Sequence, residues 1–576
     1  MSRPSRLRPW IVLFVLALAP VAATAQEAVI LSDRDVVHPV YGRHGMVASQ
    51  KAEATQVGVE VLRRGGNAVD AAVAVGFALA VVLPRAGNLG GGGFMLIHLA
   101  ASGETLALDY REAAPAAAHR DMYLDDAGAV DEQRARFSHL AVAVPGTVAG
   151  LALALERYGT MPLAEAIAPA VELAERGFPV TADVAGNLRD LRERFERWPA
   201  SRAIFLSADG TPWDIGELLV QQDLAASLRL LAAEGPRAFY EGEIARRLVA
   251  DMEAHGGLVT PEDLRRYRPA FREPVRGDYR GYEIVSMPPP SSGGVHLIQM
   301  LNVLEGYPIG YLGAGGAETI HLMVEAMKLA YADRAEHLGD PDFWEVPVAG
   351  LTSKAYAAEL RAGVDRFRAR PSAAVAAGEP APYESPDTTH YSVMDRHGNA
   401  VANTYTLNFS YGTGIVAAGT GILLNNEMDD FSAKPGVPNA YGLVGGEANA
   451  VAPGKRPLSS MTPTLVLRDG RPFLVTGSPG GSRIITTVLQ VVVNVIDHGM
   501  NVAAATAAPR VHHQWLPDEL GVEVGLSPDT LLLLAARGHR VVESNAMGST
   551  QSIMATEDGF FGAADPRRPD ALALGY

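Results

Sequence analysis

The 576-residue sequence contains no cysteine. Disulfide bonds, thiol nucleophiles and cysteine-based metal sites are therefore excluded. Basic residues are also scarce, because 49 Lys and Arg stand against 65 Asp and Glu and give a formal net charge of −16. No basic run offsets this excess, so nucleic-acid binding is disfavoured, and an anionic substrate must be held by local cations.

Long apolar segments are missing as well, and the one candidate lies at the N-terminus. Three arginines precede an apolar stretch from Trp10 to Val21, which is too short for a comfortable membrane span. Ala23-Thr24-Ala25 follows with the small residues of a cleavage site. The pattern predicts a signal peptide at residues 1–25, a periplasmic or secreted location, and no membrane span in the mature chain.

What the sequence does contain is an ordinary globular composition, with 48% apolar and 20% charged residues. The clearest break in that composition runs from Arg370 to Asp387, which is rich in Ala and Pro and has no apolar periodicity. We interpret this stretch as a mobile linker. Length alone does not decide whether the chain forms one domain or several.

A β-hairpin is predicted directly after this linker. Residues 388–394 and 400–408 alternate in side-chain type with period two, and residues 395–399 between them have turn composition. A symmetric hairpin places Thr388 opposite Thr406, so that two hydroxyl side chains meet at the end of the strands. A slip of one residue would break this pairing.

Two interpretations of Thr388 are open. The first is a Thr-rich edge strand, in which His390 lies on the strand surface. The second is a chain that is cut before Thr388, which would create a nucleophile whose own α-amine serves as its base. In that case His390, on the same face two residues along, is an alternative base.

Two glycine-rich loops invite functional interpretations. Gly480-Gly481 lies between a predicted strand (472–476) and a predicted helix (484–497). The backbone N–H groups at this position could hold an oxyanion. Alternatively, the two glycines only allow a tight turn from strand to helix. No Lys follows as a phosphate-binding loop requires. Residues 84–93 contain clustered glycines, but a helix precedes them and a strand follows, which disfavours dinucleotide binding.

The remaining motifs give no metal or cofactor site. His512 and His513 are adjacent in a predicted strand and point to opposite faces, and no carboxylate follows at ligand spacing. We therefore expect structural roles for them and no cofactor. No Gly-x-Ser-x-Gly motif is present, so a common serine hydrolase is weakly supported.

Taken together, a series of motifs along the chain resembles the bacterial γ-glutamyltransferases (γ-glutamyltranspeptidases). The series covers essentially the whole mature chain, and its order is more specific than any single member. Numbered by first residue, it comprises GMVAS at 45, GGNAVDAAVAVGFALAV at 65, AGNLGGGGFM at 86, DYREAAP at 109, MPPPSSGG at 287, TTHYSV at 388, NNEMDDFS at 425, GKRPLSSMTPT at 454, GSPGGSRIITT at 477 and GSTQSI at 548.

The resemblance implies an α+β fold, the αββα four-layer sandwich of N-terminal-nucleophile hydrolases. It also implies a precursor that cleaves itself between Asp387 and Thr388. The products would be a large subunit, residues 26–387, and a small subunit, residues 388–576, which remain one intertwined domain. The residue before the cleaved bond varies among relatives, so the rate of cleavage is not fixed by the resemblance.

By the same resemblance, Thr388 attacks the γ-carbonyl of glutathione or another γ-glutamyl compound. The acyl-enzyme is then resolved by water or by an amino acid or dipeptide acceptor. The newly exposed α-amine has an intrinsic pKa of about 8, which suits proton transfer near neutrality. Thr406 would hydrogen-bond Thr388, and Gly480 and Gly481 would form the oxyanion hole.

The resemblance also implies a binding site for the amino-acid end of the substrate. Three residues would hold its α-carboxylate, namely Arg111, Ser459 and Ser460. Three others would hold its α-ammonium, namely Asn408, Glu427 (Gln in some relatives) and Asp430. A lid loop from Pro435 to Gly446 would present Tyr441 as an aromatic gate. Apart from the resemblance, Arg111 could instead form a surface ion pair with Glu112, worth little energy.

Rival functions of two classes remain, one enzymatic and one non-catalytic. An acylase or a poly-γ-glutamate hydrolase could use the same scaffold, although the complete amino-acid-binding set argues against both. An exported binding protein that never matures is the rival from another class. One unsplit band on a denaturing gel would indicate the binding protein, and two bands would indicate the enzyme.

Overall fold

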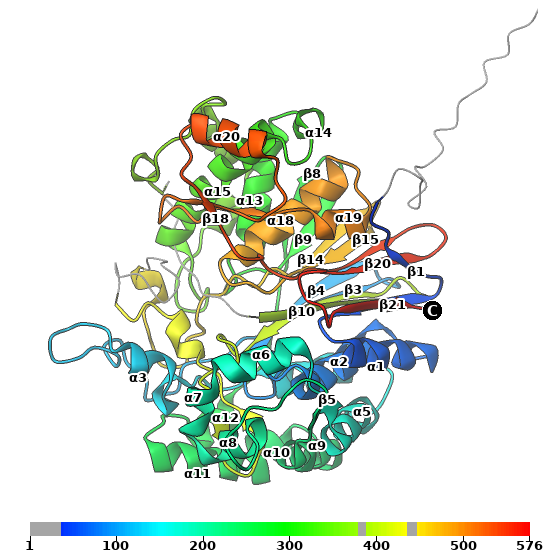
Figure 1. The fold of residues 1–576 in the computed structure, drawn as a ribbon, viewed down its shortest axis with the longest axis vertical. Coiled ribbons are helices and arrows are strands. Elements are labelled where there is room, and N and C mark those ends of the chain that lie inside the picture. The colour runs from blue at the N-terminus through cyan, green and yellow to red at the C-terminus, as the bar shows by residue number, and fades with distance from the viewer. Residues whose placement is uncertain (1–35, 378–387, 435–445) are drawn as a thin grey trace, which may run out of the picture.

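The computed structural model describes residues 36–377, 388–434 and 446–576. Two seven-stranded antiparallel sheets lie at the centre of the molecule (Figure 1). The first sheet contains the predicted hairpin and has the order β21 (Leu572–Gly575), β2 (Gly45–Ser49), β10 (Thr388–Asp395), β11 (Ala400–Thr406), β3 (Gly92–Leu99), β4 (Glu104–Tyr110) and β7 (Ala270–Arg272). The second sheet has the order β1 (Val40–Gly42), β20 (Phe560–Ala564), β19 (Gln551–Ala555), β15 (Arg471–Thr476), β14 (Thr464–Arg468), β9 (Tyr282–Ser286) and β8 (Val275–Tyr279).

Alternation along the strands builds a core on each side of the first sheet. Val393 and Val401 pack toward the helices α1 (Ala52–Arg63), α2 (Ala68–Val82) and α4 (Thr147–Tyr158). Met394 and Ala400, one residue out of phase, pack into the cluster that includes the second sheet. Helices α13 (Gly293–Glu305), α15 (Ala317–His337) and α18 (Arg483–Ile496) join that cluster (Figure 1). The predicted αββα sandwich is therefore confirmed.

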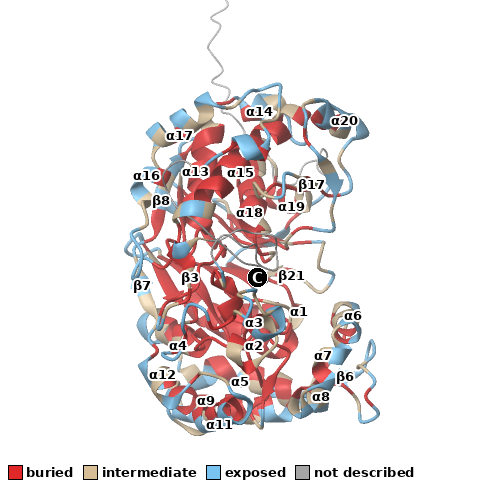
Figure 2. Ribbon diagram, turned by 90° about the vertical axis from the view of Figure 1, so that its left-hand side faces the viewer, coloured by how far each residue is buried: buried red, intermediate tan, exposed pale blue. Residues whose placement is uncertain are grey.

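Burial follows these layers, since both sheets and the inner faces of the helices are buried and the outer surface is exposed (Figure 2). Helix α2 is buried over its whole length, as its apolar sequence predicts. Its N-terminus is fixed by a capping box in which Asn67 accepts the Asp70 N–H and Asp70 accepts the Asn67 N–H.

The remaining elements surround the sandwich. The other helices are α3 (Glu132–Arg136), α5 (Leu163–Arg176), α6 (Ala182–Asp190), α7 (Arg192–Glu196), α8 (Pro199–Phe205), α9 (Gln222–Glu234), α10 (Arg237–Tyr240), α11 (Glu243–His255), α12 (Pro261–Arg266), α14 (Ile309–Leu312), α16 (Val348–Leu351), α17 (Lys354–Ala362), α19 (Val502–Ala507) and α20 (Pro528–Ala536). The short strands are β5 (Phe178–Pro179), β6 (Leu218–Leu219), β12 (Val416–Ala417), β13 (Ile422–Leu423), β16 (Val511–His512), β17 (Leu520–Val522) and β18 (Val541–Glu543). In the described part of the chain, no helix is both long and apolar enough to cross a bilayer.

Segments from before and after the predicted linker are interleaved in both sheets. Strands β10 and β11 lie between β2 and β3, and β14 pairs with β9. The two halves of the chain therefore share two hydrogen-bonded sheets.

Two sequence predictions fail in this part of the structure. Strand β10 is not an edge strand of the sheet, because β11 pairs with it from Thr388 to Met394 and β2 pairs with it on the other side from Ser392 to Asp395. The first part of the predicted linker is also anchored rather than loose. Ser372 is buried, and its backbone N–H and hydroxyl both donate to the Asp518 carboxylate. Such contacts come from distant sequence, which composition cannot reveal.

Candidate active site

Three of the predicted site positions, Thr388, Thr406 and Arg111, lie at one end of the first sheet. The hairpin register is the predicted one, with Thr388 opposite Thr406 and Met394 opposite Ala400. On the next strand Thr406 pairs with Gly92, and β4 ends beside it at Tyr110, immediately before Arg111. For Thr388 the description is confined to the backbone, and Asp387 and Tyr441 lie outside the described residues.

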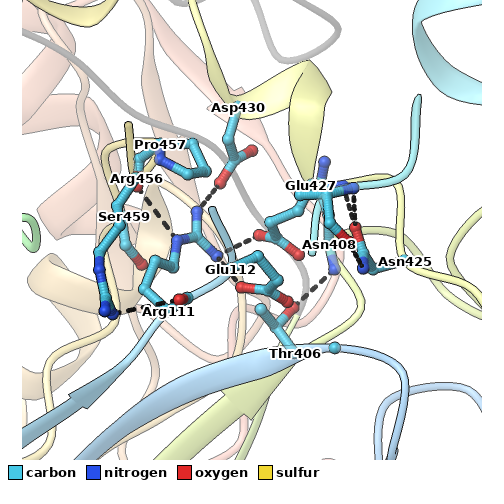
Figure 3. A network of polar contacts seen from close by, with 12 residues as sticks. Arg111, Glu112, Thr406, Asn408, Asn425, Glu427, Asp430, Arg456, Pro457 and Ser459 are labelled. Carbon is cyan, nitrogen blue, oxygen red and sulfur yellow. Dashed lines mark hydrogen bonds and ion pairs between the residues drawn. The ribbon is translucent and has the colours of Figure 1, made fainter. Parts of the chain in front are cut away.

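Arg111 is the centre of the polar cluster at this end of the sheet (Figure 3). Its guanidinium forms ion pairs with Glu427 and Asp430, and lies 3.5 Å from the Glu112 carboxylate. It also donates to the backbone carbonyls of Pro457 and Leu458, each at 3.1 Å. Because Arg111 is completely buried, the alternative of a surface ion pair with Glu112 is wrong.

Three buried carboxyl groups surround this single guanidinium. Burial raises the pKa of Glu112 to about 7, although the Arg111 charge opposes the rise. Burial also raises the pKa of Glu427, again against the pull of Arg111. The second oxygen of Glu427, Oε2, is buried and accepts no hydrogen bond from the described residues. The cluster is therefore suited to an additional cation, which would compensate the excess of acidic groups.

The two acidic predicted ligands belong to a 3₁₀ turn, Glu427–Asp430, that directly follows Asn425 and Asn426. The Asn425 side chain accepts the backbone N–H of Glu427 at 3.0 Å and donates to the Gly90 carbonyl at 2.8 Å. It thus fixes the acidic turn to the loop before β3. Sequence reasoning missed Asn425, although it opens the same NNEMDDFS motif.

Asn408 lies close to this turn and to the hairpin end. Its backbone N–H donates to the Thr406 hydroxyl at 2.8 Å, and its side-chain amide donates to the Asn426 carbonyl at 3.0 Å. Its φ of 72° is in the left-handed region, which Asn tolerates better than most residues. The residue therefore links the end of β11 to the acidic turn.

Ser459 and Ser460 follow the two carbonyls that contact Arg111. The Ser459 hydroxyl accepts the Met461 N–H at 3.2 Å, and the Ser460 hydroxyl accepts from Arg334 at 3.4 Å. This segment is held in place by Arg456, which sequence reasoning also missed despite its place in the GKRPLSSMTPT motif. Arg456 donates to the Asp109 carboxylate at 2.6 Å and to the Arg111 carbonyl at 3.2 Å.

The predicted oxyanion glycines lie in the turn between β15 and α18. Gly480 and Gly481 have φ values of 131° and 60°, a conformation that L side chains rarely adopt. The same turn begins at Gly477, where an added Cβ would lie 2.4 Å from the His390 ring. This close approach places the turn against β10 two residues from Thr388.

His390 is buried between the two sheets rather than on a strand surface, which corrects the edge-strand interpretation. Its ring nitrogens contact the hydroxyls of Thr404 at 2.9 Å and Ser392 at 3.0 Å. Burial lowers the pKa of His390 to about 3, so its imidazole is neutral at physiological pH. These contacts indicate a structural role.

The other histidines lie outside the Arg111 cluster. His512 contacts the Thr486 hydroxyl at 2.9 Å, and His513 contacts Asp518 at 3.2 Å. Two other groups in the described chain have metal-ligand composition, namely His139 with Asp251 and His255, and His321 with Glu325 and His539. Among the described residues, the side-chain partners of the Arg111 guanidinium are Glu112, Glu427 and Asp430, and no histidine donates to it or accepts from it.

With this geometry in place, comparison with known proteins is decisive. The sequence profile described as gamma-glutamyltranspeptidase matches residues 54–575. The chain belongs to the gamma-glutamyltranspeptidase family. It is 58% identical to the glutathione hydrolase proenzyme of Escherichia coli K12, over 98% of this chain and 97% of that protein. It is 43% identical to the acylase ACY 1 proenzyme of Pseudomonas sp. V22, over 93% and 94% of the two chains.

Solved structures agree with this gamma-glutamyltranspeptidase assignment. The cephalosporin acylase from Bacillus halodurans superimposes with a TM-score of 0.85 at 29% identity, over 98% of this chain and 99% of that one. The Helicobacter pylori gamma-glutamyltranspeptidase gives a TM-score of 0.56 at 44% identity, over 60% of this chain and 97% of that one. The predicted enzyme family and fold class are therefore confirmed.

Proposed function

We propose that the protein is an exported γ-glutamyltransferase and glutathione hydrolase that matures by cutting itself between Asp387 and Thr388. The single observation that carries the proposal is the convergence at one sheet end of the Thr388–Thr406 pair and the buried Arg111 cluster. The proposed nucleophile Thr388 and the proposed binding site at Arg111 thereby lie at the same end of neighbouring strands in one sheet.

Maturation would begin with attack of the Thr388 hydroxyl on the Asp387 carbonyl carbon. The C–N bond breaks as the new C–O ester bond forms, and the hydroxyl proton passes to the departing α-amine. Water then hydrolyses the ester, which leaves a carboxylate on Asp387 and a free amine on Thr388. The large subunit would comprise residues 26–387 and the small subunit residues 388–576, after removal of the signal peptide at residues 1–25.

Substrate recognition would exchange ion pairs within the Arg111 cluster. The α-carboxylate of a γ-glutamyl group would replace Glu427 and Asp430 as the ion-pair partner of Arg111. The Ser459 and Ser460 hydroxyls would donate further hydrogen bonds to that carboxylate. The α-ammonium would then pair with the two released carboxylates and the Asn408 side-chain oxygen. Arginine suits the carboxylate because its guanidinium can bind both oxygens.

Catalysis would use the same Thr388 hydroxyl. Its proton would move to the new α-amine as the oxygen attacks the γ-carbonyl, and Gly480 and Gly481 would donate N–H groups to the resulting oxyanion. Collapse of the intermediate breaks the C–N bond, the leaving amine takes the proton back from the Thr388 α-ammonium, and a γ-glutamyl ester remains on Thr388. Water or the amine of an amino acid or dipeptide then resolves that ester, and Tyr441 would restrict the entry of water.

The test is the Thr388→Ala variant beside the wild-type chain. Wild type should give two bands on a denaturing gel, with the smaller piece beginning at Thr388 by N-terminal sequencing, and should release p-nitroaniline from γ-glutamyl-p-nitroanilide. The variant should remain one band and be inactive. A smaller piece that begins at any other residue would refute the proposed nucleophile.

The acylase relative makes an acylase the second candidate function. The acidic turn distinguishes the two, because a glutaryl group has the carboxylate of the γ-glutamyl group but lacks its ammonium. If Glu427 and Asp430 bind an ammonium, wild type should prefer γ-glutamyl-p-nitroanilide to glutaryl-p-nitroanilide by about tenfold or more in kcat/KM. Equal rates would favour the acylase.

A further inference from the structure

A second loop lies directly against the turn that carries Gly480 and Gly481. We name residues 477–482 the glycine loop and residues 547–550 the support loop. The backbone N–H of Ser549 donates to the Ser478 hydroxyl at 2.9 Å. A Cβ added to Gly480 would lie 3.2 Å from the Gly548 α-carbon, so the two backbones are in contact. The glycine loop therefore rests on the support loop.

Both ends of the support loop are held by buried charged side chains. At the start of the loop, the Met547 N–H donates to the Glu523 carboxylate, and the Met547 carbonyl accepts from the Arg510 guanidinium, each at 2.5 Å. At its end, the Thr550 N–H donates to Asp565 at 2.8 Å, and the Thr550 hydroxyl accepts from Arg510 at 3.2 Å. The position of the loop is thus set by contacts of its backbone and of the Thr550 hydroxyl with buried charged groups on other segments.

These charged residues form one closed network with Arg567. Arg510 pairs with Asp565 at 2.5 Å, and Arg567 pairs with Asp565 at 3.1 Å and also with Glu523. No more than 10% of any of the four side chains is exposed. Buried ion pairs contribute little net stability compared with apolar packing, but their strict geometry can fix a single conformation.

We propose that Arg510 and Asp565 are positioning residues that, through the support loop, fix the glycine loop where its N–H groups meet the reaction oxyanion. This inference rests on the proposed function, since it requires Gly480 and Gly481 to be oxyanion donors. Such donors must lie within about 2.7–3.1 Å of the developing charge. A displacement of about 1 Å can cost about 10²-fold in rate.

The decisive variant is Gly548→Ala, compared with Gly470→Ala as a matched control. Both glycines have left-handed φ values, 67° and 74°, so both variants carry the same kind of backbone strain. A Cβ at residue 548 would lie 2.5 Å from the Ser478 hydroxyl, whereas one at residue 470 meets nothing within 4 Å. Only the first variant pushes on the glycine loop.

The readout is kcat and KM for γ-glutamyl-p-nitroanilide, calculated per mole of cleaved enzyme measured on a denaturing gel. Gly548→Ala should lower kcat by about tenfold or more with KM within about twofold of wild type. Gly470→Ala should keep both values near those of wild type. Equal kcat for the two variants would overturn the inference. An inactive wild type would instead refute the proposed function.

A second variant covers the case in which Gly548→Ala fails to fold or to cleave. Thr550→Val keeps the side-chain shape but removes the hydroxyl contacts to Arg510 and Asp565. It should lower kcat several-fold without raising KM, and Thr550→Ser should restore kcat. If Thr550→Val has the kcat of wild type, the charged network does not position the glycine loop.

Discussion

At the scale of single residues, the charge balance around Arg111 governs the candidate site. One guanidinium forms ion pairs with three buried carboxyl groups, so the charge state of each carboxyl group affects the other two. Removing one partner of a buried ion pair is costly because the remaining charge has no compensation. Substitutions here should therefore change stability as well as binding, and controls must separate the two effects.

Arg111→Ala should raise KM for γ-glutamyl-p-nitroanilide by about 10- to 10²-fold, because a charge-assisted hydrogen bond contributes about 1.5–3 kcal/mol. It should also lower the free energy of unfolding, by about 3–5 kcal/mol for a broken buried pair. The double variant Arg111→Ala/Glu427→Gln should recover part of that stability but not the KM. Steady-state kinetics and urea unfolding measure the two quantities. Recovery of KM in the double variant would contradict a binding role for Arg111.

Glu112 predicts a pH dependence of stability. Its folded pKa of about 7 lies above the ordinary value of 4.5, so between these pH values the folded chain binds more protons than the unfolded chain. Stability should therefore fall as the pH rises from about 4.5 to 7. In a Thr388→Ala background, which keeps one chain, Glu112→Gln should reduce this fall in urea unfolding.

The matched control for Glu112 is Glu60→Gln, which changes an exposed carboxyl on α1. It should leave the slope of stability against pH between 4.5 and 7 as in its parent. An identical slope in Glu112→Gln and Glu60→Gln would show that Glu112 does not titrate in this range.

Among the elements, the β10–β11 hairpin would connect the proposed maturation with turnover. Its register sets Thr406 opposite Thr388, and the Thr406 hydroxyl is itself oriented by the Asn408 N–H. An oriented hydroxyl at this position would hold the Thr388 side chain ready for attack, first on its own chain and later on substrate. The two reactions should therefore share a dependence on Thr406.

Thr406→Ala should slow both self-cleavage and kcat, by about 10- to 10³-fold if orientation is the only role of the hydroxyl. Thr406→Ser retains the hydroxyl and should restore both rates to within a few-fold of wild type. Time courses on denaturing gels and steady-state kinetics on the cleaved fraction measure them. Normal rates in Thr406→Ala would mean that the hydroxyl does not orient Thr388.

At the scale of the whole molecule, the interleaved sheets determine what a cut before Thr388 can do. Strands from both sides of the cut alternate in the first sheet, and the second sheet joins β9 to β14. Separation of the two pieces would expose strand edges and both apolar cores at once. A cut before Thr388 would therefore change the covalent structure without dividing the fold.

The cleaved protein should accordingly elute from a sizing column as one species that contains both pieces, and should unfold in one cooperative transition. Light scattering coupled to the column, followed by a denaturing gel of the peak, tests this. Elution of a separate small piece under native conditions would contradict the interleaved arrangement.

Local structure follows from the sequence because hydrophobic periodicity, caps and turn residues act over a few positions. The hairpin register and the helix after Gly480-Gly481 are predicted on that basis and confirmed, and a series of motifs indicates the family. The burial of His390 against Gly477 and the anchoring of Ser372 by Asp518 depend instead on residues far along the chain.

How the site residues act on one another depends on packing between distant parts of the chain. Arg111 is separated from Glu427 and Asp430 by more than 300 residues, and no periodicity shows that the three side chains form one buried cluster. The contact of Gly548 with the glycine loop has the same origin. Packing of the two sheets creates these neighbours, and burial then gives them the shifted pKa values and strict geometry that residue types alone do not specify.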